Sequence, residues 1–478
     1  MSPDSYEPLY GAAEMRAVES RYPGYPATAP ELMERAGAAV AREAMGAFPE
    51  ARRFAVVCGG GSNGGDGRIA ARILQAAGRD AVETDEVGGF DVVVDALFGT
   101  GFHGEPRPEA AAAIGRINAS GLPVVAVDVP SGVDASTGEV AGAAVRATVT
   151  VTFHGRKVGL AVAPGRFHAG RVVVADIGLA SEVTAVRRAT VGLLGLVPRR
   201  AASDSKHTAG RVLVVGGSPG MSGAVCLAAN AAYRADAGYV TVAAPREVLP
   251  VVEVLCLETV KVGYSAEDAV AIVLKAAERA DALAIGPGLG REPHVAAFVR
   301  TVLGRVELPA VVDADALFGL GPMSRPAPTV LTPHAGELAR LLGETSAWVD
   351  GHRLEAARSC AHRYAAVVLL KGADTIVASP TGDLVVADDG PPSLATAGTG
   401  DVLTGVIGAF LAKGMDGPTA AAAAAVAHGR AAALVMHQAG LIASDVVAAL
   451  PQALGGGPGL LSAQARSDVG ARPSSSRG

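Results

Sequence analysis

The sequence predicts two successive α/β units, each built on a largely parallel sheet with helices on both faces. Between Phe54 and Val129, short β-branched runs alternate with helix-length segments rich in Ala, Arg and Leu, which is the rhythm of βαβ units. After residue 205 a second such rhythm begins, with different loops and helix lengths. No repeat spacing relates the two halves, so we expect a fusion of unlike units and not a duplication.

Length and composition agree with a globular protein of more than one domain. The chain has 478 residues, of which 50% are hydrophobic and 18% are charged, and a chain of this length divides its core. The formal net charge of -6 excludes wholesale disorder and a generic binder of nucleic acid. The four cysteines form no CxxC pair and are expected to be reduced core residues, at Cys58, Cys226, Cys256 and Cys360.

The sequence also predicts the cellular location of the protein. The first thirty residues contain acidic side chains and lack an apolar core segment, so we expect no signal peptide. The longest apolar runs, Val402 to Ala412 and Ala420 to Ala427, are shorter than the roughly 20 residues that cross a bilayer. We therefore expect a cytoplasmic protein with no membrane segment.

A boundary between the two units is expected near residue 200. Apolar residues at helical spacing predict a helical lead-in from Ala12 to Ala47. Strong periodicity is lost between Gly178 and Thr208, where Arg, Pro and Ser gather. We expect one domain over residues 1–200, a second over 201–455, and a disordered Gly/Ser/Arg-biased tail over 456–478.

The first glycine-rich loop follows the first strand of this rhythm and opens a helix. It contains GxGxxG at Gly59, Gly61 and Gly64, so an NAD-dependent dehydrogenase is one candidate, with Glu83 or Asp85 as its ribose-binding acid. Asp66 within the loop argues against that candidate, because a carboxylate would repel a pyrophosphate. The alternative without chemistry is a tight turn in which Asp66 caps the helix.

Two further strands end in an aspartate that is followed by Gly, Ser or Thr. These are Asp95 and Asp128. Because the carboxyl ends of parallel strands meet at one edge of a sheet, both are expected in one cleft with Asn63, Asp66 and Ser131. Singly each aspartate favours a loop hydrogen bond, but together they form a hard-oxygen site suited to a cation and a general acid or base.

Four ordered motifs of the first 200 residues resemble the NAD(P)H-hydrate epimerase family: LMERAG (32–37), SNGGDG (62–67), DALFGTGFHG (95–104) and DVPSGVD (128–134). The resemblance implies a Rossmann-like domain in which Asp128 assists inversion at C6 of a hydrated nicotinamide, with Asp66 as the alternative base. It implies a K⁺ site at Asn63, Asp95 and Ser131. Ser62 departs from the Asn usual in the family and puts one side-chain hydrogen bond in doubt. The implied nucleotide-binding residues are Ser62, Asn63, Gly64, Gly65, Asp66, Gly99, Thr100, Gly101, Phe102, His103, Gly104, Glu105 and Asp128.

The second half carries its own glycine-rich turns, at 216–224, 286–290 and 394–405. In the last of these a Gly-Thr-Gly turn opens a helix, so its N–H groups and the positive end of the helix dipole suit a phosphate, with Asp401 as a base. A helix capped at Thr399 is the alternative. Lys371 is a candidate phosphate contact or a solvated strand end, and His334 a substrate contact or a loop histidine. No GxxxxGK[ST] motif occurs, so this is not a P-loop enzyme.

Together with DADAL (313–317), LTPHAGE (331–337) and LKGADT (370–375), these turns resemble the ribokinase-like superfamily, specifically its NAD(P)H-hydrate dehydratase branch. The resemblance covers residues 205 to 455 and implies a site for the hydrated nucleotide and for ADP, with Mg²⁺ on the ADP phosphates. Asp401 would be the catalytic base. The implied binding residues are Ala224, Gly288, Gly290, His334, Lys371, Gly372, Ala373, Asp374, Thr375, Gly398, Thr399, Gly400 and Asp401.

The two resemblances together imply a bifunctional repair enzyme for NADHX and NADPHX. The Ala-rich stretch from Thr419 to Met436 favours packing against a partner, so we expect a homo-oligomer. Hydration of the nicotinamide ring gives two C6 epimers, so an epimerase beside an S-specific dehydratase would allow the whole pool to be repaired. A ribokinase-like small-molecule kinase fused to a nucleotide-binding domain is the main alternative. An NAD-dependent dehydrogenase and a non-catalytic N-terminal scaffold are the others.

Overall fold

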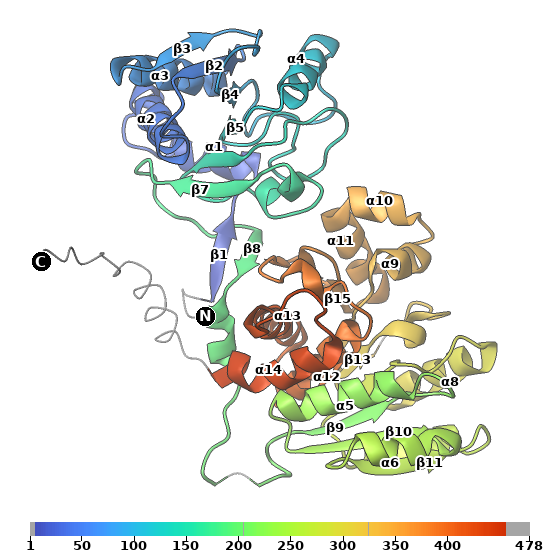
Figure 1. Cartoon of the computed structure of the whole chain (residues 1–478). Helices are drawn as coiled ribbons and strands as arrows, with labels where there is room; N and C mark the ends of the chain where they lie inside the picture. Colours follow the sequence, from blue (N-terminus) through green and yellow to red (C-terminus); the bar gives the residue numbers. More distant parts are fainter. Residues whose placement is uncertain (1–4, 204, 324, 456–478) are drawn as a thin grey trace, which may run out of the picture. The chain divides into compact units, whose positions relative to one another are not determined.

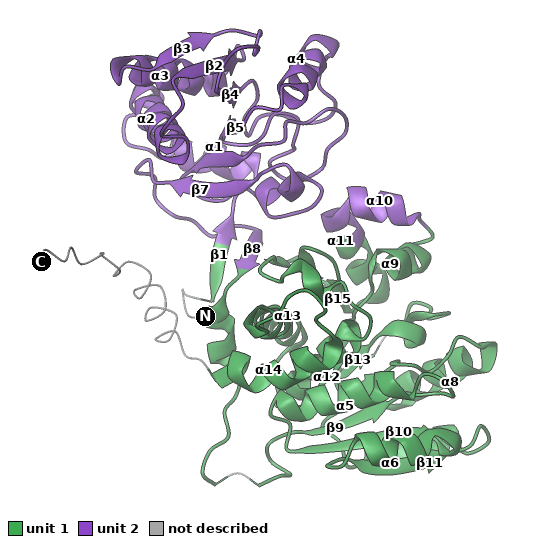
Figure 2. Ribbon diagram, in the orientation of Figure 1, with its two compact units in different colours: residues 1–7, 189–343, 357–478 green, residues 8–188, 344–356 purple. Residues whose placement is uncertain are grey.

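The computed structural model describes residues 5–203, 205–323 and 325–455. The chain divides into two compact units (Figure 2). The N-terminal unit, purple in Figure 2, holds residues 8–188 and 344–356, and the C-terminal unit, green, takes up the rest of the described chain. The division thus falls at residue 189, and one later segment groups with the N-terminal unit. The expected tail, residues 456–478, lies outside the described residues.

The N-terminal unit contains a six-stranded sheet in which every pair is parallel, in the order β3-β2-β4-β5-β6-β7. The chain runs outward from β2 to β3 and then returns to the other side of β2. The strand order therefore reverses between β2 and β4, where open α/β sheets bind ligands. The strands are β2 (Arg53–Cys58), β3 (Asp80–Glu83), β4 (Val92–Ala96), β5 (Val124–Val127), β6 (Val149–Phe153) and β7 (Arg171–Ala175).

Helices cover both faces of this sheet (Figure 1). Phe54 and Val56 pack in one cluster with residues of α2 and α3, whereas Ala55 and Val57 pack in another with α4. Successive side chains of a strand point to opposite faces, so a continuous apolar strand fits a sheet that is buried twice. The helices are α1 (Ala12–Ser20), α2 (Ala29–Ala47), α3 (Ser62–Ala76), α4 (Pro108–Ala119) and α10 (Ser346–Gly351), with 3₁₀ turns at Val158–Leu160 and Gly165–Phe167.

The sheet of the C-terminal unit runs in the order β17-β16-β15-β14-β13-β12-β9-β10-β11. Pairs from β15 to β11 are parallel, and β15, β16 and β17 are antiparallel neighbours. Its order reverses between β9 and β12. The strands are β9 (Arg211–Val215), β10 (Tyr239–Pro245), β11 (Val260–Tyr264), β12 (Ala282–Ile285), β13 (Ala310–Val312), β14 (Thr329–Leu331), β15 (Val367–Leu370), β16 (Thr375–Ala378) and β17 (Leu384–Ala387).

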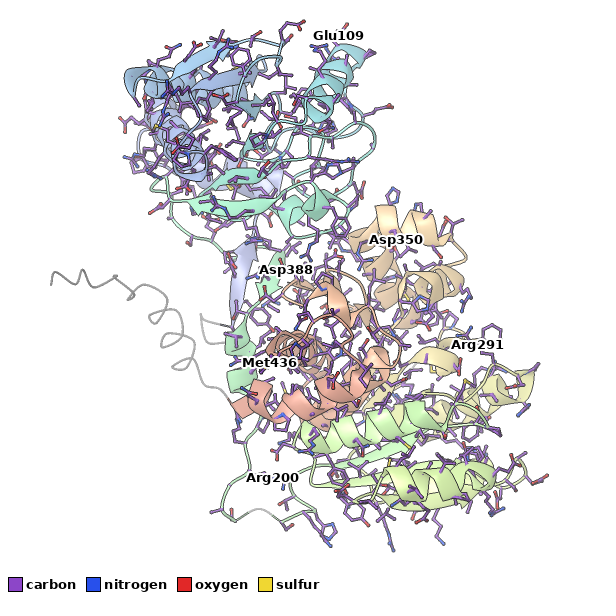
Figure 3. All side chains as sticks on the ribbon, in the orientation of Figure 1. Glu109, Arg200, Arg291, Asp350, Asp388 and Met436 are labelled. Atoms are coloured by element: carbon purple, nitrogen blue, oxygen red, sulfur yellow. The ribbon has the colours of Figure 1, made fainter. Side chains whose placement is uncertain are left out.

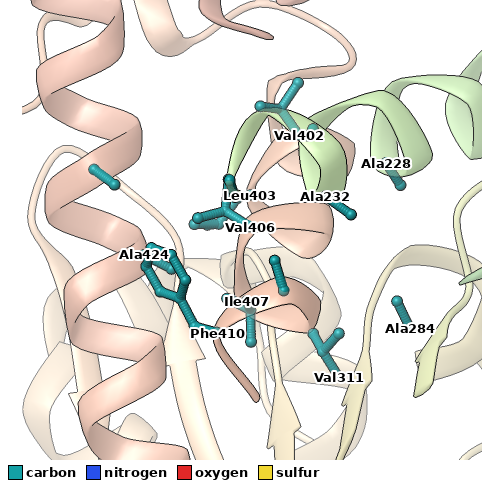
Figure 4. Packing of buried hydrophobic residues seen from close by; sticks show 14 of the residues in the cluster. Ala228, Ala232, Ala284, Val311, Val402, Leu403, Val406, Ile407, Phe410 and Ala424 are labelled. Carbon is teal, nitrogen blue, oxygen red and sulfur yellow. The ribbon is translucent and has the colours of Figure 1, made fainter. Parts of the chain in front are cut away.

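Helix α12 (Thr399–Ala412) is buried along most of its length and packs beside α5 (Ser222–Arg234) (Figure 4). A Cβ on Gly405 of α12 would lie 2.1 Å from the Ala228 carbonyl oxygen of α5, so only glycine permits this approach. The packing fixes the first turn of α12. The other helices are α6 (Leu249–Leu255), α7 (Ala269–Ala277), α8 (Pro293–Arg305), α9 (Ala335–Leu342), α11 (Arg353–Tyr364), α13 (Gly417–Leu434) and α14 (Ala443–Gly455).

Short elements complete the description. Strands β1 (Tyr6–Leu9) and β8 (Val186–Ala189) contain the residues at which the two units divide. Within the described ranges, none of the helices combines the length and the apolar character needed to cross a bilayer. The 3₁₀ turns of the C-terminal unit are Val191–Leu196, Arg246–Val248, Ala314–Leu317 and Pro392–Leu394.

Candidate active sites

A pocket of about 760 Å³ lies at the switch point of the N-terminal sheet. The loop after β2, the loop after β4 and the residue after β5 all contribute to its wall. Asp95 and Ser131 are fully buried and do not line it, nor do Gly64, Gly65 and Gly104. The lining residues that the sequence had predicted are Ser62, Asn63, Asp66, Gly99, Thr100, Gly101, Phe102, His103, Glu105 and Asp128.

Close packing explains the glycines of the first loop. A Cβ on Gly59 would lie 2.1 Å from the Leu97 carbonyl oxygen, and one on Gly64 would lie 1.9 Å from the Gly59 carbonyl oxygen. A larger residue at position 59 would push the two loops of the pocket apart, and one at position 64 would clash within the first loop. Helix α3 is capped at Gly61 and already includes Asp66, so the alternative in which Asp66 caps the helix is wrong.

Asp128 is held in an uncommon conformation beside a buried lysine. Its φ of 66° lies in the left-handed region, which a residue other than glycine seldom adopts. Its Oδ1 lies 2.6 Å from the Lys157 Nζ and accepts a hydrogen bond of 3.1 Å from the Thr152 hydroxyl. The ammonium also donates to Thr152 Oγ1 and to the Phe153 carbonyl. Backbone strain of this kind is typical of functional sites.

Sequence reasoning missed Lys157, which is fully buried and lines the pocket. One signal was present, because Lys157 is the single lysine among the first 200 residues and lies in the loop that follows the VTVTF strand. A buried ammonium requires a partner. Spacing alone could not indicate that the partner is Asp128, which lies on a different strand loop.

Asp66 faces the same pocket with an altered acidity. Burial raises its pKa to about 8, and the charges of Asp128 and Glu19 add to this effect while Lys157 opposes it. Its Oδ1 is buried and has no hydrogen-bond partner among the described residues. The pocket therefore presents a carboxyl group that keeps its proton at neutral pH together with a lysine-paired aspartate.

Of the three predicted cation ligands, Asn63 lines the pocket, whereas Asp95 and Ser131 are fully buried and do not line it. Both oxygens of Asp95 are occupied by Ser131, whose hydroxyl and backbone N–H donate at 2.6 and 2.8 Å. Burial raises the pKa of Asp95 to about 6 despite these hydrogen bonds. The Asn63 amide lies beside Gly99, and its Nδ2 is buried without a partner in the described chain. The described residues contain no cluster of three His, Cys, Asp or Glu side chains suited to a metal.

The second site lies at the start of α12. Gly398, with φ of 90°, is the residue before the helix. The Thr399 hydroxyl donates to the Leu394 and Thr396 carbonyl oxygens, so the alternative in which Thr399 caps the helix is wrong. Asp401 lies in the first turn. The amides of this turn and the helix dipole favour a negative charge there.

Lys371 connects this turn to a buried aspartate. Its Nζ lies 2.7 Å from Asp313 Oδ1, and Thr404 of α12 donates to the other Asp313 oxygen at 2.6 Å. Burial opposes the ionisation of Asp313, but Lys371 and Thr404 hold its pKa below the usual range. A Cβ on Gly400 would lie only 3.4 Å from Lys371 Nζ. The solvated-end interpretation of Lys371 is therefore wrong, because this side chain lies inside the site.

Asp401 is the titratable group of the second site. Burial raises its pKa to about 7, and the nearby charge of Asp313 adds to the rise while Lys371 opposes it. Asp401 can thus exchange a proton near neutral pH, as a general base must. Sequence reasoning singled out Asp401 but assigned no role to Asp313 or Thr404.

The remaining predicted residues lie on neighbouring loops. Gly288 and Ala224 are adjacent, since a Cβ on Gly288 would lie 3.2 Å from that of Ala224. His334 caps α9, where its Nδ1 accepts hydrogen bonds from the N–H groups of Gly336 and Glu337. Its side chain is half exposed. Gly290 belongs to the loop after β12. Gly372, Ala373 and Asp374 lie between β15 and β16, and Thr375 is the first residue of β16.

Comparison with known proteins matches both halves of the chain. A family model described as NAD(P)H-hydrate dehydratase matches residues 212–452, and one described as YjeF-related protein N-terminus matches residues 29–85 and 79–159. Proteins of Moorella thermoacetica and Escherichia coli, both named bifunctional NAD(P)H-hydrate repair enzyme Nnr, are 40% and 36% identical to this chain. Each match covers 88% of this chain, and 92% and 88% of those proteins.

Solved structures match the C-terminal unit. The ADP/ATP-dependent NAD(P)H-hydrate dehydratase of Bacillus subtilis, co-crystallised with ATP and Mg²⁺, is 31% identical with a TM-score of 0.51, and the match covers 55% of this chain and 96% of that one. A ribokinase-like superfamily protein of Enterococcus faecalis is 25% identical with a TM-score of 0.52, over 58% and 98%. The predicted fold class, a Rossmann-like unit followed by a ribokinase-like one, is confirmed.

Proposed function

Because the chain belongs to the family of bifunctional NAD(P)H-hydrate repair enzymes, we propose that its N-terminal unit interconverts the C6 epimers of NADHX and NADPHX. The C-terminal unit then dehydrates the S epimer with ADP. The observation that carries this proposal is a carboxyl group of raised pKa in each unit. In each unit, a carboxyl group with a pKa near neutrality, Asp66 or Asp401, lies within the electrostatic influence of a lysine that pairs with another aspartate.

In the N-terminal unit, Asp66 and Asp128 would divide the proton transfers at C6. Asp66 keeps its proton at neutral pH because its pKa is about 8, so it would protonate the C6 hydroxyl. The C6–O bond then breaks, which releases water and leaves a ring iminium. Asp128, paired with Lys157, would take a proton from the water that adds to C6. Addition to one face gives the R epimer and addition to the other gives S.

Asn63, Asp95 and Ser131 would hold K⁺ at this pocket. Their amide, carboxylate and hydroxyl oxygens are hard donors of the type that such cations prefer. A bound K⁺ would supply positive charge that orders the two loops of the pocket. No proton transfer passes through it.

In the C-terminal unit, Asp401 would accept the proton of the C6 hydroxyl as this oxygen attacks the terminal phosphorus of ADP. The new C6–O–P linkage forms while the bond to AMP breaks. The amides of Gly398, Thr399 and Gly400 and the Lys371 ammonium would stabilise charge on the transferred group. Elimination then breaks the C6–O bond, which releases phosphate, and a C5–H bond, whose proton passes to solvent. This restores the dihydropyridine ring and leaves NAD(P)H, AMP and phosphate.

The predicted binding residues divide between the two ligands of this site. Lys371, Thr375 and the residues between them would contact ADP together with Gly400, and Ala224, Gly288, Gly290 and His334 would contact the hydrate. Mg²⁺ would enter as its ADP complex, held by the phosphates, and would neutralise their charge. The Bacillus subtilis dehydratase that resembles the C-terminal unit was co-crystallised with ATP and Mg²⁺, which supports the binding of an adenine nucleotide by this unit.

A coupled assay tests the proposal. The full chain is incubated with the R epimer of NADHX, ADP and Mg²⁺, and the near-ultraviolet absorbance of NADH is followed. Recovery of NADH together with AMP and phosphate is expected. Accumulation of a phosphorylated hydrate without NADH would favour the kinase alternative, and hydride transfer to an unrelated substrate would favour a dehydrogenase. Dehydration of the S epimer alone would favour a non-catalytic N-terminal unit.

The location and assembly of the enzyme are further parts of this proposal. A cytoplasmic enzyme would meet its substrates where NAD(P)H is used, and a homo-oligomer is expected. Cell fractionation and light scattering of the purified chain test these two points separately.

A further inference from the structure

Two carboxylates of the DADAL motif, Asp313 and Asp315, point to different loops of the dehydratase site. They are separated only by Ala314, which has a φ of 50°. A side-chain-bearing residue adopts this left-handed conformation at an energetic cost. The conformation turns the backbone between the two carboxylates, and both are buried. The strained residue Ala314 therefore lies between two carboxylates that contact different loops.

Asp315 holds the loop that follows β12. Its Oδ2 accepts a hydrogen bond of 3.0 Å from the Gly290 backbone N–H, and its Oδ1 one of 2.7 Å from Arg291 Nε. Arg291 lies just before α8, and its side chain reaches the molecular surface (Figure 3). Gly288 and Gly290 both have positive φ, at 67° and 87°. The loop proposed to contact the hydrate is thus fixed by one carboxylate.

Asp313 binds residues of two other elements of the site. Its two oxygens bind Lys371 after β15 and Thr404 of α12 at 2.7 and 2.6 Å. These contacts join the lysine proposed to bind ADP to the helix that carries Asp401. Charge-assisted hydrogen bonds of this length are strong and directional.

The two groups also meet through the backbone. A Cβ on Gly286, at the end of β12, would lie 1.8 Å from the Asp313 carbonyl oxygen. The loop that is proposed to contact the hydrate therefore packs directly on Asp313, which binds Lys371. A shift of the DADAL turn would move both loops.

We infer that Asp313 and Asp315 are paired positioning residues, which set the separation between the hydrate and the terminal phosphoryl group of ADP. This inference rests on the proposed function of the C-terminal unit. Near-attack geometry tolerates little displacement, so a single rigid turn between the two subsites would favour reaction. A purely structural role predicts instead that changes at both residues lower stability and affect both ligands alike.

The test compares Asp315→Asn with Asp281→Asn in the full-length protein. Asp281 is a matched control because its carboxylate also accepts hydrogen bonds from a backbone N–H and from a guanidinium, both of Arg211. Asp281 comes before β12, however, whereas the Gly290 loop follows that strand. Asp315→Asn is expected to raise the KM for the S epimer about tenfold and to leave the KM for ADP unchanged. Asp281→Asn is expected to change neither KM.

The second arm uses Asp313→Asn, with Thr404→Val as a milder variant should the first fail to fold. Both are expected to weaken ADP binding, about tenfold for Asp313→Asn, with a smaller effect on the KM for the S epimer. Asp236→Asn is the control, since Asp236 pairs with Lys413 at 2.6 Å on another part of the unit.

Equal effects on both ligands in either arm, or KM values unchanged in all variants, would overturn the inference. Wild-type protein without dehydratase activity would instead overturn the proposed function. The two failures are therefore distinguishable.

Discussion

Each unit contains a lysine that pairs with a buried aspartate, but the two lysines differ in which aspartate they bind. In the N-terminal unit Lys157 binds Asp128 at 2.6 Å, and this aspartate itself lines the pocket. In the C-terminal unit Lys371 binds Asp313 at 2.7 Å, whereas the acid proposed to react is Asp401. The first lysine thus pairs with an aspartate that is proposed to react, whereas the second pairs with a neighbour of the acid that is proposed to react.

Each site also contains a second acid that does not pair with the lysine, Asp66 in the N-terminal unit and Asp401 in the C-terminal unit. Asp66 and Asp401 both have raised pKa values, at about 8 and about 7, and burial is the main cause for both. An acid with a pKa above the working pH keeps its proton and can donate it, whereas one near the working pH can accept. In both units, therefore, a lysine paired with one aspartate accompanies a second acid whose pKa burial has raised toward neutrality.

The largest expected effect comes from Asp401→Asn, which removes the proposed base. Dehydration should fall by about 10²–10⁴-fold, because the amide cannot accept the hydroxyl proton, while epimerisation stays unchanged. Asp128→Asn is the reciprocal control and should abolish epimerisation alone. Both activities are measured on each purified variant. Loss of both activities in one correctly folded variant would contradict two independent sites.

Lys157→Met should give the next largest effect. Breaking a buried ion pair from one side leaves an unpaired charge and lowers the free energy of unfolding by about 3–5 kcal/mol. Chemical denaturation followed with epimerase activity should show this loss, while dehydratase activity resists denaturant as before. Lys275→Met, at an exposed position, is the control. A variant as stable as the wild type would show that the pair does not support the N-terminal unit.

Lys371→Gln should shift a pH profile. Lys371 opposes the rise in the pKa of Asp401, so its removal should raise that pKa further. Because the base acts when ionised, dehydratase kcat/KM falls as pH drops through the pKa of Asp401, and this limb should move to higher pH by roughly one unit. Lys275→Gln serves for comparison. A limb that stays in place would mean that another group titrates.

The smallest expected effect belongs to Glu19→Gln in the N-terminal pocket. The charge of Glu19 helps to raise the pKa of Asp66, so its loss should lower that pKa by less than about one unit. Since Asp66 is proposed to act when protonated, epimerase activity falls as pH rises through its pKa. The alkaline limb should therefore move to lower pH, whereas Glu31→Gln, at an exposed position, should leave it in place. A shift to higher pH would contradict the role of Asp66 as acid.

The sequence predicted the parts of the molecule that depend on local pattern. Apolar β-branched runs, helix-length segments and glycine turns indicated both sheets and the loops at their carboxyl ends. The candidate residues Asp66 and Asp128 followed from the position of such loops, and Asp401 followed from the Gly-Thr-Gly turn that opens a helix. Helix caps were less predictable, since Gly61 and Gly398 precede the helices where Asp66 and Thr399 had been alternatives. Side-chain type alone does not reveal which residue leaves the helical conformation.

What the amino-acid sequence determined by itself is the order of strands and helices, the glycine turns and the acids beside them, because these depend on residues close together in the chain. Only the tertiary structure decided which lysine faces which acid. Lys371 and Asp313 lie 58 positions apart, and Lys157 meets an aspartate from another loop. Pairing and burial set whether each carboxyl holds or accepts a proton, and both arise from packing between distant segments.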